Sequence, residues 1–168
     1  MSLLEETRTG YMIIGGYALP FYGRIRTTLD IDIAVAAPTE EKLRSLFENA
    51  ERREYSISLG SFKNPVHIFH DKVTNYEIEV WSRPDGIVWD EKTLERRRRV
   101  TLDGLRVWIV SPEDFIVSKL ARPDRGVSDE QDVKSVMERN GVCIDWDYLE
   151  ERAEKAGVWA LLKMIRNI

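Results

Sequence analysis

The chain has 168 residues, a length that fits one domain, and 43% of them are hydrophobic, which is enough to build a core. Its 25 basic and 29 acidic residues give a net charge of −4, which argues against a protein that works mainly by non-specific attraction to nucleic acid. Cys143 is the single cysteine, which excludes disulfide frameworks, and no apolar run reaches membrane-spanning length, so we expect a soluble cytoplasmic protein without membrane contact.

The first half of the chain alternates between strand and helix patterns. A β-like run ends at Gly15-Gly16, where the pattern becomes helical, and Thr39 is a typical N-cap for a helix that continues to about Ala50. The expected elements are strands over 11–14, 29–36, 66–69 and 76–81 and helices over 17–22 and 40–50.

The second half begins with a hairpin signal and then becomes helical. Asp103-Gly104 between two apolar runs predicts a tight turn, and Ser111 before a proline predicts a helix N-cap. The expected elements are strands over 100–102 and 105–110 and helices over 112–121, 128–139 and 145–166. We therefore predict a single α+β domain over 1–168, with a mixed β-sheet and flanking helices in a core of about 10–110 and a helical C-terminal part of about 111–168.

Two aspartates, Asp30 and Asp32, are separated by one residue within the strand expected over 29–36. Alternate side chains of a strand share a face, so both carboxylates are expected to point the same way. Adjacent carboxylates repel each other unless a cation lies between them. Gly15 and Gly16 lie where a strand meets a helix, and their bare backbone can approach a phosphate closely. This combination indicates a Mg²⁺-dependent phosphoryl or nucleotidyl transfer site.

The order of these motifs resembles the polymerase-β-type nucleotidyltransferase superfamily. The closer likeness is to its small stand-alone prokaryotic members, which include toxin and abortive-infection-like proteins. The matching segments are Gly15-Gly16-Tyr17-Ala18, Arg26-Thr27-Thr28-Leu29-Asp30-Ile31-Asp32, the run from Ser111 to Leu120, and Asp129-Glu130-Gln131-Asp132-Val133. The resemblance implies the nucleotidyltransferase fold for this chain.

In that superfamily three carboxylates hold two divalent ions, so the resemblance implies that Asp30 and Asp32 are the first two catalytic metal ligands. The third ligand should come from a later strand, where Glu79 is favoured because apolar residues flank it, and Glu77 is the alternative. The superfamily usually has aspartate at this position, so a glutamate is a departure from its pattern. The implied metal is Mg²⁺, with Mn²⁺ as the alternative.

Several further residues are expected to contact the nucleotide. Arginine suits bidentate phosphate contacts, although Arg24 is equally well explained by a salt bridge to a nearby carboxylate. Asp129 and Asp132 could pair with Lys119 or Arg122, or cap a helix. The residues predicted to bind nucleotide are Gly15, Gly16, Arg26, Thr28 and Lys119.

The function implied by the resemblance is metal-dependent nucleotidyl transfer. The enzyme would move a nucleoside monophosphate from a nucleoside triphosphate to an acceptor hydroxyl or phosphate and release pyrophosphate. The acceptor could be a small molecule, an RNA or a protein, and the chain could form a homodimer or pair with a toxin–antitoxin-type partner. The alternative is a non-catalytic nucleotide-binding sensor or protein-partner domain of the same fold.

Overall fold

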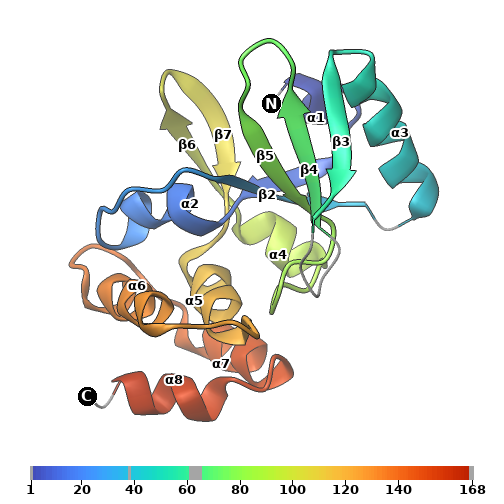
Figure 1. Cartoon of the computed structure of the whole chain (residues 1–168). Helices are drawn as coiled ribbons and strands as arrows, with labels where there is room; N and C mark the ends of the chain where they lie inside the picture. Colours follow the sequence, from blue (N-terminus) through green and yellow to red (C-terminus); the bar gives the residue numbers. More distant parts are fainter. Residues whose placement is uncertain (1, 38, 61–65, 167–168) are drawn as a thin grey trace.

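The computed structural model describes residues 2–37, 39–60 and 66–166 (Figure 1). Its strands are β1 (Gly10–Ile13), β2 (Ile31–Ala36), β3 (Tyr55–Leu59), β4 (Val66–Asp71), β5 (Glu77–Trp81), β6 (Arg98–Leu102) and β7 (Leu105–Ile109). Its helices are α1 (Ser2–Glu6), α2 (Gly15–Tyr22), α3 (Glu40–Glu51), α4 (Glu91–Arg96), α5 (Pro112–Ala121), α6 (Val127–Glu138), α7 (Trp146–Lys155) and α8 (Trp159–Arg166).

The strands form one mixed seven-stranded sheet in the order β3-β4-β5-β2-β1-β7-β6. β2 lies antiparallel to β1 and parallel to β5, and the second pairing places Asp32 directly opposite Glu79. The predicted α+β architecture with a mixed sheet is therefore confirmed. The sheet brings the two strands that carry carboxylates next to each other, although α3, β3 and β4 separate them in the sequence.

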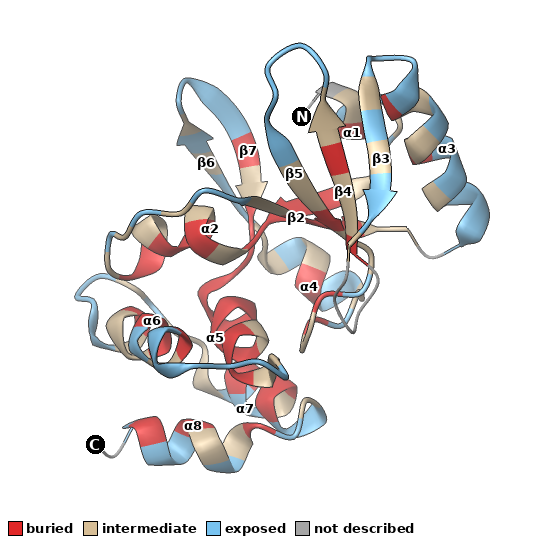
Figure 2. Ribbon diagram, viewed as in Figure 1, coloured by how far each residue is buried: buried red, intermediate tan, exposed pale blue. Residues whose placement is uncertain are grey.

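The apolar core forms two clusters on opposite faces of the sheet. Ile33 and Val35 of β2 belong to the cluster that also contains residues of α1 and α3. Ala34, between them, belongs to the cluster that contains residues of α2 and of α5 to α8. This alternation follows from the strand geometry, and it assigns Asp32 to the face that the C-terminal helices cover. α5 is buried along most of its length between the sheet and the other helices (Figure 2).

The structure corrects some predicted boundaries. β2 begins at Ile31, so Leu29 and Asp30 lie in the loop that precedes the strand. The helix predicted over 145–166 is two helices, because Gly157 adopts a left-handed φ of 71° between α7 and α8. The structure also contains α1, β3 and α4, which were not predicted; β3 is a mostly exposed five-residue strand at the sheet edge, and its pattern gives a weak signal.

None of the helices in the described ranges is long and apolar enough to cross a membrane.

Candidate active site

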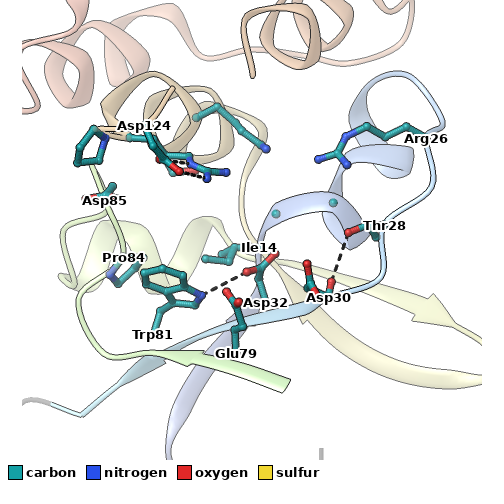
Figure 3. A pocket seen from close by; sticks show the side chains of 16 residues that line it. Ile14, Arg26, Thr28, Asp30, Asp32, Glu79, Trp81, Pro84, Asp85 and Asp124 are labelled. Atoms are coloured by element: carbon teal, nitrogen blue, oxygen red, sulfur yellow. Dashed lines mark hydrogen bonds and ion pairs between the residues drawn. The ribbon is translucent and has the colours of Figure 1, made fainter. Parts of the chain in front are cut away.

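A pocket of about 500 Å³ opens where α2 begins, on the sheet face beneath α5 (Figure 3). Its walls come from the β1–α2 turn, the loop before β2, β2, β5 with the segment after it, and α5 with the segment after it. The residues that line it are Ile14, Gly15, Gly16, Arg26, Thr28, Asp30, Asp32, Glu79, Trp81, Pro84, Asp85, Ser118, Lys119, Arg122, Pro123 and Asp124. Every residue predicted to bind metal or nucleotide, except the alternative ligand Glu77, lies in this wall.

The two glycines at the start of α2 are explained by the side chains that pack against them. Gly15 has a φ of 63°, and a Cβ at this position would collide with the Asp32 carboxylate. A Cβ on Gly16 would lie 2.6 Å from the Cβ of Thr28. The Asp32 carboxylate therefore lies against the N-terminal end of a helix, where the unpaired backbone N–H groups and the helix dipole favour negative charge. The same backbone could also cradle a phosphate, which stays a prediction.

Asp32 and Glu79 form a close carboxylate pair at the base of the pocket. They are direct neighbours across β2 and β5, and their carboxyl groups lie close enough to perturb each other's pKa. Burial raises the pKa of Asp32, and burial followed by repulsion from Asp32 raises the pKa of Glu79 to about 7. The indole N–H of Trp81 donates to Oδ1 of Asp32 over 3.2 Å.

Asp30 and Glu77 differ in how they relate to this pair. Asp30 is exposed at the pocket rim, and the Thr28 hydroxyl donates to its backbone carbonyl over 3.4 Å. Glu77 is exposed outside the pocket, where its carboxylate lies 3.7 Å from Nδ1 of His70. Of the two glutamates considered for the third ligand, Glu79 is therefore the one that lies beside Asp32.

The basic residues near the pocket converge on one buried aspartate. Asp132 has no exposed side-chain surface, and its carboxylate oxygens lie 2.8 Å from Nε of Arg24, 3.2 Å from Nε of Arg26 and 3.3 Å from Nζ of Lys119. Arg24 also donates to Gln131 and Ser128, so the salt-bridge interpretation of Arg24 agrees with the structure. These contacts attach the segment before β2 to α6.

Lys119 is buried on α5 and is paired with two carboxylates. Its Nζ donates to Asp129 over 2.9 Å, in addition to its contact with Asp132. Arg122 lies 3.6 Å from Asp129 and 2.8 Å from Asp124. Lys119 reaches the pocket wall, so a phosphate that binds its ammonium group would have to compete with the carboxylates of Asp129 and Asp132.

The carboxylates that line the pocket determine whether it suits a divalent cation. Among the described residues, no three acidic, histidine or cysteine side chains form a ready-made metal cluster. The pair formed by Asp32 and Glu79 nevertheless has the character of a cation site, because two crowded, partly buried carboxylates retain a proton that a cation would replace. With Asp30 at the same rim, the available oxygen ligands fit Mg²⁺ or Mn²⁺.

Two features of the site were missed in the sequence. Nothing in the local pattern marked Trp81 as a partner of Asp32, although its position two residues after Glu79 places both side chains on one strand face. The sequence pattern predicted the helix that begins after Ser111 but not the contacts of its Asp114. This aspartate is buried and accepts hydrogen bonds from the hydroxyls of Ser111 and Tyr148, so this part of the motif joins α5 to α7.

A glycine turn at a helix start, beside paired carboxylates on neighbouring strands of a mixed sheet, defines a domain of the nucleotidyltransferase class. The family model described as "Nucleotidyltransferase of unknown function (DUF6036)" matches residues 1–164, and the chain belongs to this family. No curated protein sequence matches the chain.

Three solved structures share the fold at low sequence identity. The antibiotic-resistance factor ANT(2'')-Ia is 14% identical with a TM-score of 0.58, and the match covers 99% of this chain and 92% of that one. The lincosamide antibiotic adenylyltransferase LnuA, bound to lincomycin, is 14% identical with a TM-score of 0.54, and the match covers 82% of this chain and 91% of that one. An antigenic nucleotidyltransferase-like protein from Paracoccidioides brasiliensis is 18% identical with a TM-score of 0.54, and the match covers 96% of this chain and 88% of that one. These likenesses, with the family match, confirm the predicted fold and superfamily.

Proposed function

We propose that this protein transfers a nucleoside monophosphate from a nucleoside triphosphate to an acceptor hydroxyl, with Mg²⁺ bound by Asp30, Asp32 and Glu79. The observation that carries the proposal is the Asp32–Glu79 pair beside the glycine turn of α2. A cation-binding carboxylate pair next to a phosphate-binding helix start is the arrangement that nucleotidyl transfer needs.

Binding of the triphosphate would use the positive side of the pocket. The free N–H groups at Gly15 and Gly16 would contact phosphate oxygens, and Arg26 and Lys119 would contribute charge from the segment before β2 and from α5. Thr28 would hold the loop that carries Asp30, because its hydroxyl donates to the Asp30 carbonyl. The bound metal would neutralise phosphate charge and lower the pKa of the acceptor hydroxyl.

Glu79 would act as a metal ligand in this reaction. Beside Asp32, its carboxylate would be ionised once the cation is bound, because the cation replaces the proton that the pair retains without it. The proton of the acceptor hydroxyl would pass to water as the new phosphodiester bond forms. The pyrophosphate would leave toward the α2 turn, and no covalent enzyme intermediate is needed.

The nucleotide and acceptor can be proposed more narrowly from the structural neighbours. One is an adenylyltransferase of lincosamide antibiotics, and another was solved with adenylyl-2''-tobramycin. By analogy we propose ATP as the donor and a small hydroxyl-bearing molecule as the acceptor, in a cytoplasmic reaction. A sensor that binds nucleotide without turnover is the alternative, because Lys119 and Arg26 are already paired with carboxylates.

Calorimetric titration with ATP, GTP, CTP and UTP, each with Mg²⁺, tests the proposal. The wild type is expected to bind at least one triphosphate in a metal-dependent way, and the Asp30→Asn/Asp32→Asn double variant is expected to lose this binding. Glu79→Gln should weaken metal-dependent binding, whereas Glu77→Gln, a matched change on the same strand outside the pocket, should not. Failure of the wild type to bind every triphosphate would refute the proposed donor site.

A further inference from the structure

We infer that Trp81 is a positioning residue that holds the Asp32 and Glu79 carboxylates in the orientation that receives the metal; this inference rests on the proposed function. Trp81 is the last residue of β5 and follows Glu79 by two positions, so the two side chains project from the same face of the sheet. Both residues line the pocket (Figure 3).

The contacts of Asp32 show how its carboxylate is fixed from two directions. Oδ1 accepts the indole N–H of Trp81 over 3.2 Å. Oδ2 lies against Gly15, at the place where a Cβ would collide with it. A carboxylate held on one side by a hydrogen bond and on the other by backbone has little freedom to rotate. The position of Asp32 is therefore set before any ligand binds.

Trp81 also reaches the second carboxylate of the pair. Its indole N–H donates to Asp32 and lies close enough to Glu79 to lower the pKa of that carboxyl. An indole N–H is a donor only, so it can favour these carboxylates but cannot itself bind a cation. Its partial positive charge offsets some of the repulsion between Asp32 and Glu79, which lets both groups remain close in the metal-free protein.

The tryptophan ring is itself held in place by the fold. It is partly buried and packs against the apolar cluster on the helix-covered sheet face. Because the ring is packed in this way, its N–H group has a fixed position beside the carboxylates. A phenylalanine at this position would keep most of this packing but would remove the N–H, so Trp81→Phe tests the contribution of the indole N–H.

The first experiment compares Mn²⁺ binding by the wild type, Trp81→Phe and Trp108→Phe, measured by the electron paramagnetic resonance of free Mn²⁺, alone and with α,β-methylene-ATP. Removing the hydrogen-bonding partner of a metal ligand typically weakens metal affinity 10- to 100-fold, and we expect a loss in this range for Trp81→Phe. Trp108 lies on β7 outside the pocket, so Trp108→Phe should bind as the wild type does. Urea unfolding without metal checks that both variants are folded.

The second experiment follows the indole N–H directly by ¹⁵N–¹H correlation spectra of tryptophan-labelled protein. The cross-peak absent from Trp81→Phe identifies Trp81. We expect this peak to shift when Mg²⁺ is added to the wild type and to stay in place in Asp32→Asn. The peak of a purely structural tryptophan would stay in place in the wild type as well.

The outcomes separate the inference from the proposed function. The positioning role is wrong, and the metal site is supported, if the wild type and Trp81→Phe bind Mn²⁺ equally tightly and the Trp81 peak does not shift when Mg²⁺ is added. If the wild type binds no Mn²⁺ with or without the nucleotide analogue, the proposed function is wrong and the inference is overturned with it.

Discussion

Replacing Asp132 with asparagine is expected to destabilise the junction between the segment before β2 and the C-terminal helices. The carboxylate of Asp132 is fully buried and lies within 3.3 Å of nitrogen atoms of Arg24, Arg26 and Lys119. Asparagine has nearly the same shape but carries no charge. The substitution therefore leaves three cations close together without the anion that holds them.

The magnitude follows from how easily each cation can find another partner. Breaking a buried ion pair by removing one member costs about 3–5 kcal/mol of unfolding free energy. The side chains of Arg24 and Arg26 are 34% and 31% exposed, so both can be hydrated again, and Lys119 keeps its 2.9 Å contact with Asp129. We therefore expect a loss at the lower end of that range, about 3 kcal/mol.

Urea unfolding monitored by tryptophan fluorescence measures this loss, with Asp124→Asn as the matched control. Asp124 is paired with Arg122 over 2.8 Å, but its side chain is 62% exposed, so its replacement should cost less than about 1 kcal/mol. If Asp132→Asn destabilises the protein no more than Asp124→Asn does, the buried network does not hold this junction and the reasoning is refuted.

Two further predictions concern backbone and pH. Gly15→Ala should destabilise the protein more than Gly104→Ala and should remove Mn²⁺ binding, because both glycines have a positive φ but only a Cβ on Gly15 meets Asp32. A Cβ on Gly104 meets open space, so Gly104→Ala should lower the unfolding free energy by only about 1–2 kcal/mol. Equal losses of the two variants in urea unfolding would contradict this prediction. Burial raises the pKa of Asp114 to about 6, above its unfolded value, so its contribution to stability is lost as pH rises from about 4 to 6. Asp114→Asn should therefore gain about 2 kcal/mol relative to the wild type between pH 4 and pH 7, and an unchanged difference in unfolding free energy would refute the assignment.

Much of the candidate site could be predicted from short stretches of sequence. The glycine pair, the strand position of Asp32 and the N-caps at Thr39 and Ser111 depend on the backbone within a few residues, and local patterns report such features well. The choice of Glu79 over Glu77 also began from a local pattern, the apolar residues on both sides of it. The roles of these residues in binding metal and nucleotide stay predictions.

What the sequence by itself determined was therefore the fold class, the superfamily and the order of the motifs. The tertiary structure decided which side chains meet. Arg24 contacts Asp132 across 108 residues, and Trp81 contacts Asp32 across 49, and no periodicity in the chain encodes either distance. Such contacts arise from the sheet order and from the packing of α6 against the segment before β2. Local patterns specify elements, but pairing between distant elements depends on how their buried faces fit together.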